Sequence, residues 1–526
     1  MDNNNSMPSR RALLLAAAAP VFGATRDLNC DIAVIGASFG GVAAALAALR
    51  NGYTVVLTEE TDWIGGQVTS QMVPPDEHQW IEQFGGTRAY RDYRNGVRAY
   101  YHRNFPLTED ARAKPFLNPG EGSVSRITHE PRVSLEVLES MLQPYISGGR
   151  LRLLLEHKPV SASVDRDRVQ AVTVARGNVQ RTITAKYFID GTDQGELLPL
   201  TKTEFVTGFE TGEPHGPSQP QPNNIQATTW CFAMSHHPGE DHTIDKPATY
   251  DFWKSYTPNL KPSWSGKLLS WSYSDPITLK AKTLGFDPEK PTQGVLNLWT
   301  YRRIAAKSNF RPGAYTSDIC LVNWPQNDYW LTGKPEEAKQ LSLSLLYWMQ
   351  TDMGFKGLKL RGDVSGTEDG LAKYAYIRES RRIQAEFTVL EQHVGQEARR
   401  SLTTAEPFAD SVGIGYYRID LHPSTGGDNY IDIASMPFQI PLGSLIPKRV
   451  ENLLPACKNL GTTHITNGCY RLHPVEWNIG ESAGCLAAFA LTRKEPPRRV
   501  RADQTLLKDF QSWIQTQGIE LAWPRP

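Results

Sequence analysis

The sequence predicts an α/β fold, because it opens with the pattern strand, glycine turn, helix, strand. Residues 31–35 (DIAVI) form a short apolar run typical of a buried strand, and residues 41–50 (GVAAALAALR) form a helix of small residues. Asn51 and Gly52 end that helix, since glycine readily takes the left-handed conformation that caps a helix. A second apolar run at 54–60 (TVVLTEE) predicts the next strand.

A second observation supports the α/β class and adds an antiparallel part. Residues 128–142 (THEPRVSLEVLESML) predict a helix. Residues 151–190 follow as a series of strand-like runs, with turn residues at 165–167 and 177–178. We therefore expect a β-meander that ends near residue 190 and leads back to the first sheet.

Size and composition predict more than one structural unit. The chain has 526 residues, of which 40% are hydrophobic and 10% aromatic, as in a globular protein with a large core. Residues 206–375 begin with a loop rich in Pro, Gly and Asn and contain many Trp and Tyr residues, which indicates an inserted α+β domain. These aromatic residues could pack a core or line a site for an aromatic or sugar-like substrate.

The glycine turn at 36–41 (GASFGG) stands where a βαβ unit binds a dinucleotide. Gly36 permits the tight turn, and Gly41 lets the helix pack close to the strand. Ser38 occupies the middle glycine position, where its small side chain can donate to a phosphate. The helix N-terminus offers free N–H groups to a pyrophosphate. Glu59, at the end of the second strand, can accept hydrogen bonds from ribose hydroxyls.

The segment that follows resembles the FAD-dependent oxidoreductase family, which is distantly similar to flavoproteins of the fumarate reductase and glycine oxidase type and to the flavin subunit of heterodisulfide reductase. That family carries an acid, three further residues and then W-L/I-G-G-Q-x-T after the second strand, and residues 59–69 (EETDWIGGQVT) match it. Residues 188–197 (FIDGTDQGEL), 376–383 (YIRESRRI) and the closing segment 440–491 resemble further family motifs. The closely spaced cysteines of the heterodisulfide reductase relatives are missing, so no iron–sulfur cluster is expected.

The resemblance implies a Rossmann-like FAD-binding domain, with FAD as the cofactor. By the same resemblance, a helix that follows Arg471 and Pro474 points its N-terminus at the flavin. The sequence shows no second dinucleotide turn for NAD(P)H. The residues expected to bind FAD are Gly36, Ala37, Ser38, Phe39, Gly40, Gly41, Glu59, Gly65, Gly66, Gln67, Val160, Thr192, Gly195, Gly480 and Glu481.

The FAD-binding domain is expected to be discontinuous along the chain. We assign residues 28–205 and 376–492 to it, and residues 206–375 to an inserted substrate domain. Residues 493–526 are expected to form a helical tail.

The N-terminus resembles an export signal. Arg10 and Arg11 precede a short apolar run at 12–22, which is shorter than the span of about 20 residues that crosses a membrane. The pattern is similar to a twin-arginine signal over residues 1–24, a route that carries folded, cofactor-loaded proteins. It predicts a periplasmic or secreted protein.

Charge and cysteine usage exclude several classes of function. Lys and Arg number 56, as do Asp and Glu, and no basic stripe is present, so nucleic acid is not an expected partner. The six cysteines include no CxxC pair, so no metal site is expected. No segment after the signal is long and apolar enough to predict a membrane span.

Three residues are candidates for the chemistry. His78 follows the Gly-Gly-Gln loop, and Arg471 and His473 lie together in the closing segment. A histidine can act as general base near neutral pH, and an arginine can hold negative charge on the reduced flavin or a substrate carboxylate. Structural roles, a hydrogen-bonded histidine or an ion pair, are the alternative for each.

We expect the protein to transfer a hydride between a small organic substrate and the flavin N5, with the final electron acceptor and the oligomeric state left open. One alternative is a redox-neutral lyase or isomerase that uses the flavin to remove and return a hydride. Another is a carbohydrate-binding or structural protein with a vestigial flavin site.

Overall fold

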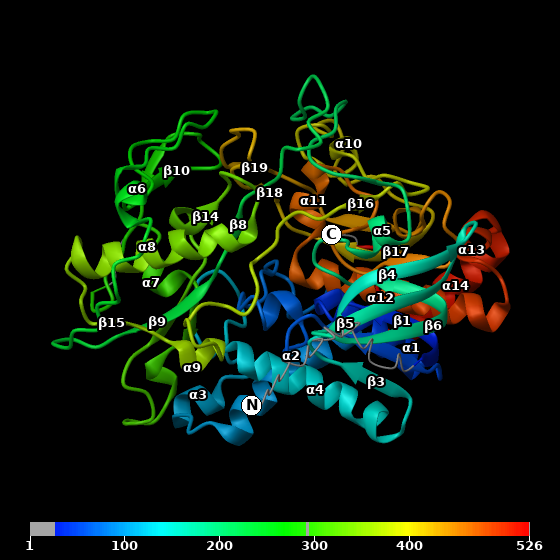
Figure 1. Ribbon diagram of the computed structural model, residues 1–526, viewed down its shortest axis with the longest axis horizontal. Helices are drawn as coiled ribbons and strands as arrows, with labels where there is room; N and C mark the ends of the chain where they lie inside the picture. Colours follow the sequence, from blue (N-terminus) through cyan, green and yellow to red (C-terminus); the bar gives the residue numbers. More distant parts are fainter. Residues whose placement is uncertain (1–26, 291–293, 525–526) are drawn as a thin grey trace, which may run out of the picture.

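The computed structural model describes residues 27–290 and 294–524, arranged in two lobes (Figure 1). One lobe contains the N-terminal and C-terminal parts of the chain, drawn in blue, cyan and red, around a large sheet. The other lobe contains most of the predicted insert at 206–375, drawn in green. The start of the insert packs on the first lobe instead, where Phe209 stacks on His464 and His215 pairs with Glu391. The predicted signal at 1–24 lies outside the described residues.

The glycine turn follows β1, an inner strand of a seven-stranded sheet. β1 (Leu28–Ile35) pairs in parallel with β2 (Val55–Thr58), and α1 (Phe39–Arg50) connects them. On its other side β1 pairs in parallel with β6 (Val179–Asp190). The side chains of the second half of β1 are buried, as both faces of a parallel sheet must be. The α/β prediction is confirmed.

The predicted meander is antiparallel over three strands, but its first run has a different place. β4 (Lys158–Asp165), β5 (Arg168–Arg176) and β6 pair antiparallel, with turns where the sequence predicts them. β3 (Leu151–Leu154) instead pairs in parallel with β2 at the far edge. The helix α4 (Pro131–Ser147) leads into β3, and a strand reached through a crossover helix joins a sheet in parallel. The sheet order is β3-β2-β1-β6-β5-β4, with β21 (Leu453–Pro455) beside β6.

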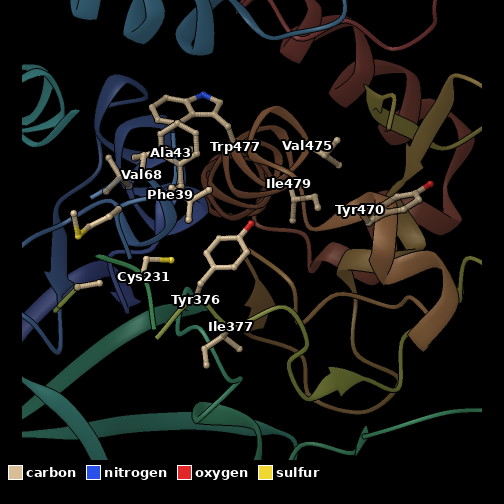
Figure 2. Packing of buried hydrophobic residues seen from close by; sticks show 14 of the residues in the cluster. Phe39, Ala43, Val68, Cys231, Tyr376, Ile377, Tyr470, Val475, Trp477 and Ile479 are labelled. Carbon is tan, nitrogen blue, oxygen red and sulfur yellow. The ribbon is translucent and has the colours of Figure 1, made fainter. Parts of the chain in front are cut away.

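The long closing helix α12 (His473–Arg493) packs directly on α1. Small residues allow this close approach: a Cβ on Gly480 would lie 1.9 Å from the Gly40 carbonyl oxygen. The aromatic ring of Phe39 packs edge-on against Trp477, with ring centroids 4.8 Å apart. Figure 2 shows Phe39, Ala43 and Trp477 gathered beside α12, with the Tyr376 ring close by. The two helix N-termini therefore lie near each other.

The middle of the chain folds around a four-stranded antiparallel sheet and one long helix. The strands of this sheet lie in the order β12-β13-β9-β15, and they are β9 (Phe232–His236), β12 (Arg303–Ala305), β13 (Ile319–Val322) and β15 (Leu358–Leu360). The long helix is α8 (Ala338–Thr351). Its other elements are α6 (Tyr250–Ser255), β10 (Ser272–Ser274), β11 (Ala281–Thr283), α7 (Leu298–Tyr301), β14 (Asp328–Tyr329) and α9 (Gly362–Ser365), with β8 (Thr228–Thr229) beside β14. β7 (Phe205–Val206) precedes them and pairs with β16 (Arg382–Ile383) of the other lobe.

Two small antiparallel sheets follow in the chain before the closing helices. β18 (Ile419–Leu421) pairs with β19 (Ile431–Ile433), and β17 (Ser411–Gly415) pairs with β20 (Phe438–Pro441). The remaining elements of the lobe that contains the seven-stranded sheet are α2 (Arg88–Asn104), α3 (Glu109–Ala113), α5 (Leu197–Leu200), β16 (Arg382–Ile383), α10 (Glu391–Val394), α11 (His464–Tyr470) and the tail helices α13 (Pro497–Ala502) and α14 (Gln504–Thr516).

Candidate functional site

The glycine turn is compact enough to bring backbone against backbone. Gly36 has a φ of 93°, and a Cβ there would lie 2.5 Å from the Gly191 carbonyl carbon. A Cβ on Gly41 would lie 2.1 Å from the Gly36 carbonyl oxygen. Ser38 caps α1, because its hydroxyl accepts a hydrogen bond from the Gly41 N–H at 3.2 Å. The turn therefore has room only for glycine at these positions.

Of four amides in this turn, two are bonded within the protein and two are available to a ligand. The Ala37 N–H donates to Glu59 Oε2 at 3.1 Å, and the Gly40 N–H donates to Glu476 Oε1 at 3.1 Å. Among the described residues, the amides of Ser38 and Phe39 have no hydrogen-bond partner. They lie at the N-terminus of α1, where the helix dipole and free N–H groups favour a phosphate.

Glu59 follows the end of β2 and lies beside the turn. Its Oε1 accepts from the Thr61 N–H at 2.9 Å, while its other oxygen accepts from Ala37. Burial raises the pKa of Glu59 to about 8. A small cavity here is lined by Gly36, Glu59, Glu60, Ser70, Pro159, Gly191, Thr192, Asp193, Glu196 and Tyr374. The location suits the ribose of a dinucleotide.

The loop after β6 reaches the same place, as the family motif implies. Gly191 touches Gly36, and Thr192 lines the small cavity. Gly195 has a φ of 65° and lies further along this loop. Val160 lies on β4, next to the cavity-lining Pro159, and its side chain is 40% exposed.

A buried lysine near the turn was missed by the sequence reasoning. Lys458 Nζ lies 2.7 Å from Asp193 Oδ1 and 3.7 Å from Glu476 Oε2, and its side chain is fully buried. Burial works against its charge, but the two carboxylates raise its pKa above the ordinary value. Because Glu476 also binds the Gly40 N–H, this ammonium group lies close to the expected phosphate position. A lysine three residues after the apolar strand β21 was the signal in the sequence.

The Gly-Gly-Gln loop packs on the glycine turn. The Gly65 N–H donates to the Ala37 carbonyl at 2.7 Å, and both Gly65 and Gly66 have positive φ. The Gln67 amide NH₂ donates to the Arg471 carbonyl at 3.1 Å and to Glu476. The loop thus connects the nucleotide turn with the closing segment.

Two predicted cofactor residues on α12 contact different ends of α1. Gly480 allows α12 to approach α1 at Gly40. Glu481 pairs with Arg50 at 2.6 Å, and Arg50 is the last residue of α1, whereas the turn lies at the start of that helix. The structure therefore does not bring Glu481 together with the other predicted residues.

The two predicted histidines are buried in structural contacts. His473 Nδ1 accepts from the Asp76 N–H at 3.0 Å, and burial lowers the pKa of His473 to about 4. His78 accepts from the Trp80 N–H at 3.2 Å and donates to the Gly85 carbonyl at 3.1 Å. Burial also lowers the pKa of His78. Neither ring lines the polar cavity described next.

A polar cavity lies between the two lobes, and we call it the interlobe cavity. Arg471 is the one predicted catalytic residue that lines it. The insert contributes one wall and the β18–β19 sheet another. The lining residues are Asp76, Tyr273, Pro276, Leu284, Leu296, Leu298, Tyr301, Arg302, Asn323, Trp324, Pro325, Tyr376, Arg378, Tyr417, Arg418, Asp420, His422, Tyr430, Asp432 and Arg471.

His422 is held between two carboxylates in this wall. Its Nδ1 donates to Asp328 Oδ2 at 2.6 Å, and its Nε2 lies 3.3 Å from Asp420 Oδ2. Arg378 Nη2 lies 2.9 Å from Asp328 Oδ1. Burial opposes ionisation of Asp328, but Arg378 and His422 outweigh it and lower the pKa of Asp328 to about 2. Asp328 is thus a fixed carboxylate that orients the imidazole.

Arg471 and Arg418 bind the neighbouring carboxylates. Arg471 Nη2 lies 2.9 Å from Asp420 Oδ2, and Arg418 Nε lies 2.6 Å from Asp432 Oδ2. Burial, followed by the nearby charge of Asp420, raises the pKa of Asp432 to about 7. The signal for this wall was in the sequence, because Arg418, Asp420 and His422 alternate with apolar residues and so share one face of a strand.

Two further features concern only the described part of the chain. Across residues 27–290 and 294–524, no three His, Cys, Asp or Glu side chains are grouped so that they could hold a metal ion. No helix within those ranges combines the length and the apolar character needed to cross a membrane.

Comparison with known proteins gives remote structural similarities. No curated protein matches the chain significantly. L-proline dehydrogenase from P. horikoshii is 17% identical over 37% of this chain and 26% of that chain, with a TM-score of 0.18. OxyS anhydrotetracycline hydroxylase from Streptomyces rimosus is 9% identical over 92% and 65%, with a TM-score of 0.36. A mutant of E. coli quinol fumarate reductase FrdA is 10% identical over 94% and 74%, with a TM-score of 0.32.

The chain spans less than two thirds of the first two of these structures. The family comparison is far broader, since residues 31–512 match the family described as FAD dependent oxidoreductase. The glycine turn, the free amides of Ser38 and Phe39 and the acid at Glu59 all fit the dinucleotide part of FAD. The protein therefore belongs to the FAD dependent oxidoreductase family, an enzyme family whose cofactor is FAD.

Proposed function

We propose that this enzyme transfers a hydride between FAD and a small organic substrate bound in the interlobe cavity. One observation carries the proposal: a chain of hydrogen bonds joins the cavity to the nucleotide turn. Tyr376 lines the cavity and donates to Gln67 Oε1 at 2.9 Å. Gln67 donates to Glu476, which accepts from the Gly40 N–H at the start of α1. A substrate in the cavity would therefore lie near the bound cofactor.

His422 is the group proposed to handle the proton. Its Nδ1–H is held by Asp328, and its Nε2, beside Asp420, is the atom proposed to take a proton from a substrate hydroxyl or amine. The imidazolium that results is stabilised by Asp328 on one side and Asp420 on the other. When bound, FAD supplies the hydride acceptor.

Arg471 is proposed to stabilise negative charge on the substrate oxygen. Its guanidinium is buried and already oriented by Asp420, so it needs little reorganisation when charge develops. Arg378 supports this arrangement indirectly, because it fixes the carboxylate that orients His422.

The proposal is tested by mixing the FAD-loaded enzyme without oxygen with a panel of organic alcohols and amines. Bleaching of the visible flavin absorbance by one of them is the expected result. One product formed for each flavin, with the flavin staying reduced, would favour an oxidoreductase. Turnover with no net reduction of the flavin would favour a redox-neutral lyase or isomerase. Absence of FAD from the purified protein would favour a binding protein with a vestigial site.

We also propose export to the periplasm or the medium, on the strength of the Arg10–Arg11 pair and the apolar run after it. Replacing both arginines with lysine should leave the protein in the cytoplasm, as cell fractionation would show. Normal export of the double variant would rule out the twin-arginine route.

A further inference from the structure

The interlobe cavity offers aromatic surfaces from both lobes. Tyr273 and Trp324 belong to the insert, whereas Tyr417 and Tyr430 lie beside the β18–β19 sheet. The rings of Tyr273 and Tyr430 have centroids 6.3 Å apart and an interplanar angle of 77°, so they form a corner. Aromatic rings combine a large apolar face with a polar group at one end, which suits ligands that are apolar on one face and polar at the edge.

The charged groups of the cavity balance one another. Each of four arginines has a carboxylate partner within 3.0 Å, so the set carries no formal net charge when all are ionised. These pairs are Arg302–Asp76, Arg378–Asp328, Arg418–Asp432 and Arg471–Asp420. A cavity selective for an anion or a cation would be expected to carry an uncompensated opposite charge, because electrostatic complementarity sets specificity.

The lining also holds buried polar atoms that have no partner among the described residues. They are mostly donors, with one acceptor among them. These atoms are Nε of Arg302, Arg378 and Arg471, Nε1 of Trp324 and Oδ1 of Asp432. A group with several hydroxyls can both accept from such donors and donate to such an acceptor, whereas a carboxylate can only accept.

We propose that the substrate is a neutral polyhydroxylated compound of the sugar or cyclitol class, oxidised at a secondary alcohol; this rests on the proposed function. The carbinol C–H bond breaks with its electron pair going to FAD, the hydroxyl proton goes to His422, and the C–O bond becomes a carbonyl. FAD is the oxidant and is reduced by two electrons. The apolar ring face of such a compound packs on the tyrosines, and its hydroxyls bind the ion pairs.

The first test measures binding separately from reduction. Neutral hexoses and cyclitols, their matched uronic acids and their amino sugars are titrated into the FAD-loaded enzyme, and binding is followed by the shift of the flavin spectrum. At least one neutral compound should bind tenfold or more tightly than its charged counterparts. If no neutral compound binds, or if an acid or an amine binds more tightly, the inference is overturned.

The second test changes the charge balance. At pH 8.5, where the Asp432 carboxyl is largely ionised, Asp432→Asn should leave Arg418 uncompensated and raise the binding of uronic acid relative to hexose about tenfold. Arg418→Gln should lower the same ratio by a similar factor. Asp369→Asn, which removes the carboxylate of an exposed pair with Lys339, is the matched control and should leave the ratio unchanged. Equal ratios in all three variants would contradict the charge-balance argument.

The two proposals fail in distinguishable ways. A neutral polyol that binds but never reduces the flavin would refute the proposed hydride transfer and leave the substrate class standing. Reduction by a carboxylic acid or an amine alone would refute the substrate class and leave hydride transfer standing.

Discussion

At the scale of single residues, the roles of the histidines can be separated by substitution. His422 lines the cavity between two carboxylates, whereas His473 is buried with a pKa of about 4 and stays neutral above that pH. His422→Gln should slow flavin reduction about a hundredfold to ten-thousandfold, because it removes the proposed base. His473→Gln and His78→Gln, as controls with retained FAD, should reduce the flavin at nearly the wild-type rate.

The measurement is stopped-flow flavin reduction with each variant, at equal FAD content. Slow reduction in His473→Gln together with normal reduction in His422→Gln would transfer the role of base to the closing segment.

Glu59 should make the stability of the FAD-free protein depend on pH. Its folded pKa, about 8, lies above the ordinary value of 4.5, so the folded state binds the proton more tightly than the unfolded state. Stability is then fully present below pH 4.5 and is lost as the pH rises to 8, by up to about 4 kcal/mol from this group. Glu59→Gln should reduce that loss, and it should also weaken FAD binding because the acceptor for the ribose is changed.

Chemical denaturation of the FAD-free forms at pH 5 and pH 8 measures this effect. Glu451→Gln, at an exposed pair with Arg168, is the control and should follow the wild type. Parallel pH dependence of wild type and Glu59→Gln would show that the Glu59 carboxyl is not destabilised by its burial.

At the scale of elements, the contact between α1 and α12 should depend on glycine at its crossing point. A methyl group on Gly480 would lie 1.9 Å from a backbone oxygen of α1, which a side-chain rotation cannot relieve. Gly480→Ala should therefore cost about 2 kcal/mol or more, although alanine is the better helix former. The control is Gly216→Ala, where the nearest atom would be 3.3 Å away. Equal unfolding midpoints for the two variants would disprove tight packing.

The elements that could be predicted are those whose signals are local in the chain. The glycine turn, α1 and β2 follow one another within about thirty residues, so spacing alone predicts their arrangement. β3 was assigned to the wrong part of the sheet, because a short apolar run does not reveal its partner. The interlobe cavity could not be predicted, since it joins Asp76, Arg302, Asp328 and Asp420 from distant parts of the chain. Alternation in β18 hinted at one wall, but nothing local pointed to the opposite one.

At the scale of the whole molecule, the cavity depends on two lobes meeting. Arg302 of the insert pairs with Asp76 of the other lobe at 3.0 Å, and Tyr376 links the cavity to the nucleotide turn through Gln67. Breaking the buried Arg302–Asp76 pair by Arg302→Leu should lower both stability and flavin reduction, because Asp76 would remain as an unpaired buried charge. FAD binding should suffer less than reduction, since the nucleotide turn belongs to one lobe only.

The central claim is that a substrate in the interlobe cavity gives its hydride directly to FAD. The most direct measurement is single-turnover flavin reduction, without oxygen, by a substrate carrying deuterium on the carbon that is oxidised. The account predicts a primary isotope effect on flavin bleaching in the wild type, with much slower bleaching in His422→Gln at unchanged FAD content. Bleaching at the same rate with both isotopes, together with an unaffected His422→Gln variant, would contradict it.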